Sequence, residues 1–149
     1  MGDGILKALG ISITTNEIAI AILEKISTAK PILIHTSKTP VKKHNDNAKL
    51  MDWFESVFIE LITQHKPDSV AYRMILNPNK DQIPAWEFPL GVLNLVCFKH
   101  SLPCIGYSSS KITGSATKVN AVRFPEAVKS SNYQKYAMEA AYRACEGKK

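Results

Sequence analysis

Residues 7–25, KALGISITTNEIAIAILEK, contain two apolar runs that are separated by a short polar break at 14–16. Isoleucines recur at alternate positions on both sides of the break, and β-branched residues of this kind favour extended strands. Asn16 suits a tight turn because it tolerates a positive φ angle. We therefore predict a β-hairpin with strands at about 5–13 and 17–24.

The next stretch predicts a third strand and a long helix. Residues 31–41, PILIHTSKTPV, read as a strand in which Pro40 is typical of a sheet edge. In residues 46–65 the apolar side chains recur at helical spacing, which indicates an amphipathic helix with one broad apolar face. Pro67 ends this helix.

The second half of the chain alternates strands and helices. Residues 69–76, SVAYRMIL, and 103–107, PCIGY, predict two further strands. A helix from Trp86 or Pro89 to His100 is apolar almost all round, so we expect it to be well buried. Gly91 should let that helix lie close to a neighbour.

A last helix is expected at 131–145, after a short helix that follows Pro125. It carries a stripe of alanines suited to lying close on a sheet. The element order βββαβαβα, without repeats or a long linker, predicts one α/β domain over residues 1–149. In it an antiparallel meander is joined to two parallel strands.

Composition limits the classes of function. The chain has 149 residues, a net charge of +6, 45% hydrophobic and 21% charged residues, which is typical of a single soluble domain. A basic balance permits binding to nucleic acid. No apolar run approaches the ~18 residues of a membrane span, and the first ten residues lack a signal-peptide pattern, so we expect no membrane contact and a cytoplasmic location. The odd number of cysteines, Cys97, Cys104 and Cys145, without CxxC spacing, disfavours a zinc site or a disulfide framework.

Four short stretches carry a resemblance to a known group of proteins. They are LGIS at 9–12, SVAYR at 69–73, YSSSKIT at 107–113 and AMEAAYRA at 137–144. With the element order, they resemble the Holliday-junction-resolvase branch of the ribonuclease H-like superfamily, and more closely a small, uncharacterised bacterial family within it. The resemblance covers nearly the whole chain. It implies a five-stranded mixed sheet in the order 3-2-1-4-5, flanked by helices on both faces.

The resemblance also implies an acidic site, which this sequence has largely lost. Nucleases of this kind use two divalent ions held by converging carboxylates. Here Ser12 stands where the first aspartate belongs, Arg73 stands at or beside a glutamate position, and only Glu139 keeps an acid. A dication facing Arg73 would be repelled, so we expect no metal, no cofactor and no catalytic residues.

Arg73 has two interpretations. Its side chain could extend from the strand end to water, or its guanidinium could pair with Glu139 and replace the attraction between ion and carboxylate. A degenerate site of this kind predicts a non-catalytic module that binds DNA, RNA or a protein partner.

The basic loop at 108–124 is the candidate phosphate contact, through Lys111, Lys118 and Arg123. The alternative for these residues is an ordinary solvated cationic loop. His35, His44, His65 and His100 show no ligand spacing, so we assign no metal ligand to them.

Two other functions stay open. One is a metal-dependent endonuclease, acting on structured DNA or RNA with Mg²⁺ and the displaced acids Glu17, Asp68 and Glu139, although turn and cap roles also explain the first two. The other is a structural subunit that docks through the 86–100 helix or a strand edge. Homodimers through that helix occur among the resembled resolvases, so a homodimer is a further candidate.

Overall fold

The computed structural model describes residues 4–14, 16–42, 46–74, 83–108 and 132–146. Its elements, in chain order, are β1 (Ile5–Ile13), β2 (Glu17–Ile26), β3 (Ile32–Pro40), α1 (Asn47–His65), β4 (Ser69–Met74), α2 (Ile83–Lys99), β5 (Cys104–Ser108) and α5 (Asn132–Cys145). The short helix predicted after Pro125 lies outside the described residues.

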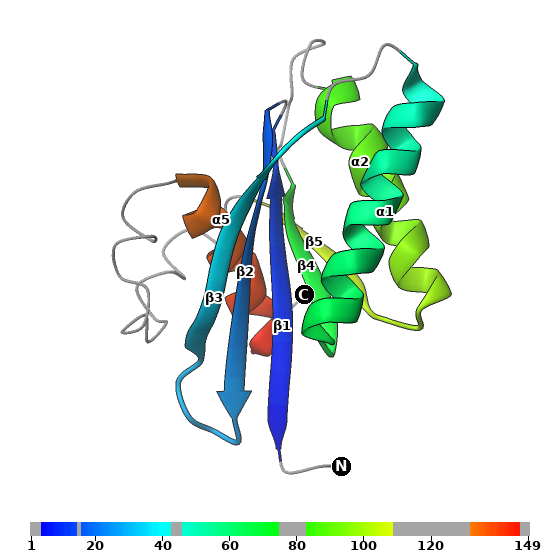
Figure 1. Cartoon of the computed structure of the whole chain (residues 1–149). Coiled ribbons are helices and arrows are strands. Elements are labelled where there is room, and N and C mark those ends of the chain that lie inside the picture. The colour runs from blue at the N-terminus through cyan, green and yellow to red at the C-terminus, as the bar shows by residue number, and fades with distance from the viewer. Residues whose placement is uncertain (1–3, 15, 43–45, 75–82, 109–131, 147–149) are drawn as a thin grey trace.

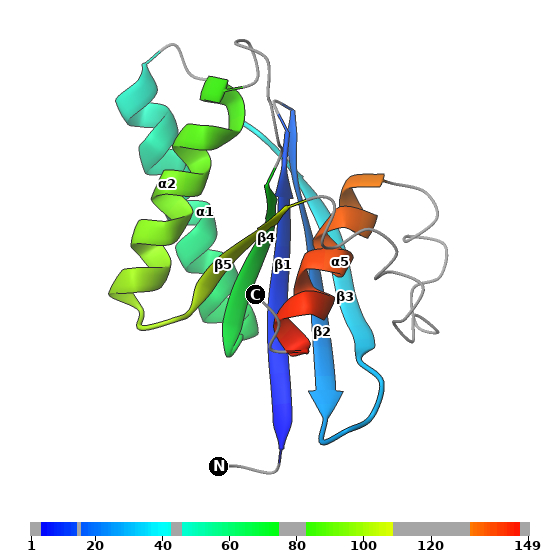
Figure 2. The ribbon, with the colours of Figure 1, turned by 180° about the vertical axis from the view of Figure 1, so that it is seen from behind.

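A five-stranded sheet in the order β3-β2-β1-β4-β5 runs through the molecule, which confirms the predicted order. β1, β2 and β3 are antiparallel neighbours, whereas β4 pairs in parallel with both β1 and β5. α1 and α2 cover one face of the sheet and α5 covers the other (Figure 1, Figure 2). The predicted α/β architecture is therefore correct.

The two faces of the sheet have different cores, because successive side chains of a strand point to opposite faces. The side that faces α1 and α2 is filled by isoleucines of β1 and β2 with Phe54 and Phe58 of α1. The side that faces α5 is filled largely by alanines from β1, β2, β4 and α5. Cys97 of α2 is fully buried in the first of these cores.

α5 lies directly on β1 at Gly10. A Cβ atom at this position would overlap the carbonyl oxygen of Ala137, and it would lie 2.8 Å from the Ala137 carbonyl carbon and 2.9 Å from the Ala141 nitrogen. These are backbone atoms, which cannot rotate away as a side chain would. The buried alanines of α5 are the stripe that the sequence predicts for a helix lying close on a sheet.

Local signals set the ends of α1 and the hairpin turn. The Asp46 side chain caps α1 by accepting a 2.8 Å hydrogen bond from the Ala48 backbone, and Lys66 ends the helix with φ 48°. In the hairpin, the Thr14 hydroxyl accepts hydrogen bonds from the Asn16 and Glu17 backbone nitrogens at 3.2 and 3.1 Å. The predicted turn is therefore present, and Asn16 lies in it without a positive φ angle.

The prediction for the second helix was wrong in its start and in its burial. α2 begins at Ile83 and contains Pro89 within it. Prolines suggest a break in a sequence, but Pro84 lies in the first turn, where no backbone N–H is needed. Among the described residues of α2, Leu93, Val96 and Cys97 are buried, but Phe98 is 82% exposed and Leu95 48%.

Gly91 of α2 does not provide the predicted close approach within this chain. A Cβ atom there would meet nothing within 4 Å. Among the described helices, none combines the length and the apolarity needed to cross a membrane.

Two histidines meet at the end of α1, although no spacing in the sequence indicates it. The ring centroids of His35 in β3 and His65 in α1 are 5.0 Å apart. The Lys7 ammonium donates to the His65 carbonyl oxygen at 3.2 Å and lies 3.8 Å from the Glu24 carboxylate. Burial lowers the pKa of His65 below 6.5, and the charges of His35 and Lys7 lower it further.

Gly10→Ala should reduce the free energy of unfolding by about 1–3 kcal/mol or more, because the added methyl group overpacks a rigid backbone contact. Urea unfolding followed by circular dichroism measures the change. Gly91→Ala is the matched control, which should be neutral or stabilising by up to about 1 kcal/mol at an open helical position. Equal stabilities of wild type and Gly10→Ala would contradict the contact.

Stability should also fall as the pH is lowered from about 7.5 to about 5.5, because the unfolded chain protonates His65 more readily than the folded chain. The contribution of a histidine with a lowered folded-state pKa is fully present above its unfolded pKa of about 6.5 and is lost as the pH falls below that value. Urea midpoints at the two pH values measure it. His65→Gln should reduce the loss and His100→Gln should keep it; identical losses in wild type and His65→Gln would refute the assignment.

Candidate functional site

The C-terminal ends of β1 and β4 lie side by side on the face that α5 covers. Ile11 of β1 pairs with Tyr72 of β4 in parallel register, so Ser12 and Arg73 follow at the next position of each strand. The residue two positions before each of them, a glycine in β1 and an alanine in β4, packs against α5. Because strand side chains alternate, Ser12 and Arg73 both point to the α5 face.

α5 brings Tyr136 and Glu139 to the same interface. These residues are three positions apart and therefore lie on one side of the helix. Glu139 is only 4% exposed and Ser12 only 7%. Glu139 also has an interaction partner. Ser12 and Arg73 thus point to the face that α5 covers, and Glu139 is buried on α5 itself.

The guanidinium of Arg73 lies over the ring of Tyr136, with its central carbon 3.8 Å from the ring centroid. This is well within the ~6 Å at which a cation is attracted to an aromatic face. An Arg73–Glu139 ion pair, one of the two interpretations of the sequence, is absent from the ion pairs between described residues. The aromatic ring, rather than a carboxylate, therefore holds the arginine at the strand end.

A second arginine and a second tyrosine lie between the sheet and α5. The sequence did not predict this contact or the contact of Arg73 with Tyr136. The Arg143 guanidinium carbon is 5.8 Å from the ring centroid of Tyr107, which is buried on β5. Burial raises the pKa of Tyr107, while the Arg143 charge opposes the rise. The helical spacing of Tyr136, Glu139 and Arg143 on α5 is the signal that could have indicated a shared polar side.

These residues do not fit the pair of divalent ions that the resemblance implies. A magnesium site needs oxygen ligands, usually from carboxylates, but the region offers a serine hydroxyl, one buried carboxylate and a guanidinium. Like unit charges 4 Å apart repel by about 4 kcal/mol at an effective dielectric constant near 20, and a dication is repelled more strongly. Within the described residues, no group of three His, Cys, Asp or Glu side chains could hold a metal.

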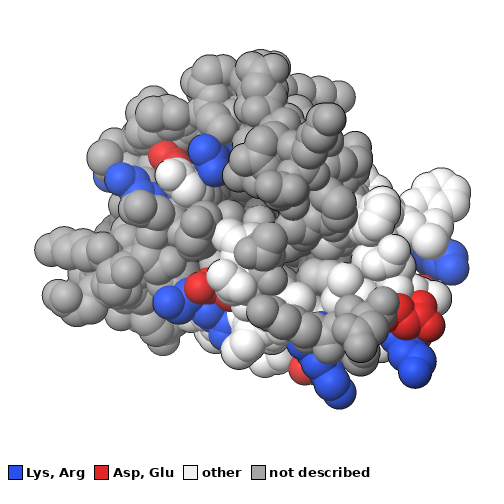
Figure 3. Space-filling view, turned by 90° about the horizontal axis from the view of Figure 1, so that it is seen from above, with Lys and Arg blue, Asp and Glu red and all other residues white. Residues whose placement is uncertain are grey.

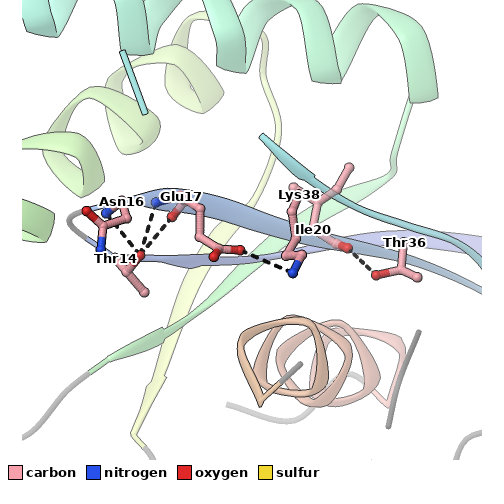
Figure 4. A network of polar contacts seen from close by, with 6 residues as sticks. All are labelled: Thr14, Asn16, Glu17, Ile20, Thr36 and Lys38. Carbon is pink, nitrogen blue, oxygen red and sulfur yellow. Dashed lines mark hydrogen bonds and ion pairs between the residues drawn. The ribbon is translucent and has the colours of Figure 1, made fainter. Parts of the chain in front are cut away.

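Glu17, a proposed displaced ligand, lies at the hairpin end of β2 and extends toward the α5 side (Figure 4). Its carboxylate is 4.0 Å from the Lys38 ammonium on β3, and one of its oxygens is buried without a hydrogen bond. Its backbone oxygen accepts from the Thr14 backbone at 2.9 Å. The glutamate therefore takes part in the hairpin and in an ion pair between strands.

Asp68, the other proposed displaced ligand, lies at the opposite end of the sheet. Its side chain accepts a 2.8 Å hydrogen bond from the Lys7 backbone, next to the start of β4. Lys7 and the hairpin end of β1 at Ile13 are six residues apart, which at ~3.3 Å per residue is about 20 Å. Asp68 and Glu17 therefore lie too far apart to bind the same pair of metal ions.

The predicted phosphate-binding residues Lys111, Lys118 and Arg123 lie outside the described residues, so their role stays a prediction. Figure 3 looks onto the hairpin end of the molecule. On its described part, basic and acidic side chains are interspersed and do not gather into one basic patch. Lys42, just after β3, is exposed.

No protein-family model matches the sequence, and no curated protein matches it. Among solved structures, Thermus thermophilus RuvC in complex with a Holliday junction substrate matches with a TM-score of 0.73 at 12% identity, over 95% of this chain and 94% of that chain. A further structure of Thermus thermophilus RuvC gives 0.71 at 13% identity, over 95% and 97% of the two chains.

The yeast mitochondrial Holliday junction resolvase matches with a TM-score of 0.59 at 10% identity, over 92% of this chain and 75% of that chain. Together with the strand order, these likenesses define the class: the chain has the ribonuclease H-like fold, in the form seen in Holliday junction resolvases. The resemblance stated from the sequence is confirmed at the level of the fold.

The lack of a carboxylate cage can be tested by restoring one with Ser12→Asp and Arg73→Glu together. Mg²⁺ or Mn²⁺ at about 100 times its Kd should then raise the stability of the double variant by about 2.7 kcal/mol, because the ion binds only the folded chain. Differential scanning fluorimetry across a metal titration measures the shift. The wild type is the control and should show no metal-dependent shift; a saturable shift in the wild type would contradict the poor fit.

Proposed function

We propose that this chain is a non-catalytic ribonuclease H-like module that binds nucleic acid. The observation that carries the proposal is the Arg73–Tyr136 contact beside Ser12, since it puts a cation where a nuclease needs carboxylates. The net charge of +6 favours a polyanionic partner. The fold likeness to a RuvC structure in complex with a Holliday junction substrate supports DNA as that partner.

Phosphate contacts would supply most of the affinity, because they release counterions regardless of base sequence. We assign these contacts first to Lys111, Lys118 and Arg123 of the basic loop. The three cysteines are free thiols, which supports our proposal of a cytoplasmic location, where thiols stay reduced.

A protein partner is the second candidate, and the outer side of α2 supports it. Phe98 is 82% exposed, and Phe88 and Leu95 are 43% and 48% exposed. An open apolar groove of about 490 Å³ lies beside them, lined by Asn47, Ala48, Met51, Phe88, Gly91, Val92 and Leu95. Exposed apolar surface of this kind often marks a protein interface, and a second copy of the chain is the occupant we propose.

Binding of a fluorescein-labelled four-way DNA junction and of single-stranded DNA tests the leading proposal. Affinity measured by anisotropy should fall by orders of magnitude between 50 and 200 mM salt if several phosphates are contacted. Replacing Lys111, Lys118 and Arg123 with Gln should reduce the steepness of this dependence.

The alternative, a metal-dependent endonuclease using Glu17, Asp68 or Glu139, is tested on the same DNA. With Mg²⁺ or Mn²⁺ present, we expect no cleavage by the wild type. Cleavage that disappears in Glu139→Ala would overturn the non-catalytic proposal.

Sedimentation with Phe98→Glu tests the dimer separately, since a charge at this exposed position should dissociate a dimer formed through α2.

A further inference from the structure

We infer that Arg73 itself binds a phosphate oxygen of the nucleic acid, so that a guanidinium fixed to the strand end takes the position that metal ions occupy in a nuclease. This inference rests on the proposed function, because it names the group that contacts the polyanion. It differs from the predicted basic-loop contact, since it places one phosphate at the strand ends.

Arg73 is held in place before any ligand binds. It stands near the end of β4, where it pairs with Tyr107 of β5, one position beyond the last β1–β4 pair, Ile11 with Tyr72. The Tyr136 ring, 3.8 Å from the guanidinium carbon, fixes the side chain from α5. Because the side chain is ordered beforehand, less conformational entropy is lost when it binds an anion.

The donors of Arg73 are the groups that would bind the anion. A guanidinium is planar and carries five N–H donors around its edge. Arg73 is partly exposed and forms no ion pair among the described residues. Two parallel N–H donors at such an edge match two oxygens of a phosphate.

The one ion pair on the α5 face near this end of the sheet, among the described residues, does not favour or oppose an anion. Lys38 of β3 and Glu17 lie 4.0 Å apart, and two strands, β2 and β1, separate β3 from β4. This pair therefore adds no net charge beside Arg73. Glu139 is buried, and its carboxylate is not presented to solvent.

The test measures the affinity and its salt dependence for a fluorescein-labelled four-way DNA junction. Arg73→Gln should weaken binding about tenfold, because a charge-assisted hydrogen bond is lost. It should also reduce the slope of log affinity against log salt by about one. Lys49→Gln on α1, at the opposite face, removes the same charge and is the matched control, which should change neither quantity appreciably.

Variants of the supporting ring separate positioning from charge. Tyr136→Leu should lower the affinity without changing the salt slope, because the charge of Arg73 remains while its orientation is lost. Tyr136→Phe keeps the ring and should bind like the wild type. Urea midpoints within experimental error of the wild type would show that the variants are folded.

The outcomes distinguish the two proposals. If the wild type binds and Arg73→Gln has the wild-type affinity and slope, the inference is wrong and nucleic-acid binding stands. If the wild type shows no salt-dependent binding to the junction or to single-stranded DNA, the proposed function fails and the inference fails with it.

Discussion

The close approach of α5 to β1 at Gly10 is the constraint on which the site depends. Without a Cβ atom at this position, the backbones of Ala137 and Ala141 lie against the strand, and the helix is fixed in depth and in rotation. Tyr136 then lies over Arg73, and Glu139 is buried at the interface. A larger residue would lift α5 away from the sheet and separate the helix residues from the strand ends.

Replacing carboxylates by a guanidinium changes what the strand ends can bind. A carboxylate cage concentrates negative charge and needs a metal ion to neutralise it, so binding of phosphate depends on the ion. An arginine carries its own positive charge, attached covalently and oriented by an aromatic ring. Such a site can attract a phosphate directly. It does not provide the two metal ions that stabilise the attacking and the leaving oxygen in a nuclease. A strand end without carboxylates is therefore compatible with the nucleic-acid binding that we propose.

The two faces of the sheet have separate tasks. The α5 face holds the polar strand ends and is packed with small residues, which lets one helix lie close. The other face holds the large apolar core under α1 and α2. α2 is apolar on all sides, yet Phe98 is 82% exposed and Leu95 48%, whereas Leu93, Val96 and Cys97 are buried. The described part of the fold thus carries the polar strand ends on one face and exposed apolar side chains of α2 on the other.

The sequence by itself determined the order of the elements, because alternation and helical spacing are local properties and the hairpin fixes the first strand pairing. The full strand order was implied by the family resemblance, and the sheet confirms it. Through the resemblance the sequence also predicts that Ser12, Arg73 and Glu139 share one site. The predicted start of α2 was wrong, since a proline in the first helical turn, Pro84, looks like a break in the sequence. Its predicted burial was wrong because burial depends on which elements surround a helix. Only the tertiary structure decided that Arg73 contacts Tyr136 and forms no ion pair with Glu139 among the described residues, and that Asp68 and Glu17 lie at opposite ends of the sheet. The physical reason is that such contacts depend on the depth and rotation of α5 against β1 and on distances across the sheet, which no local pattern encodes.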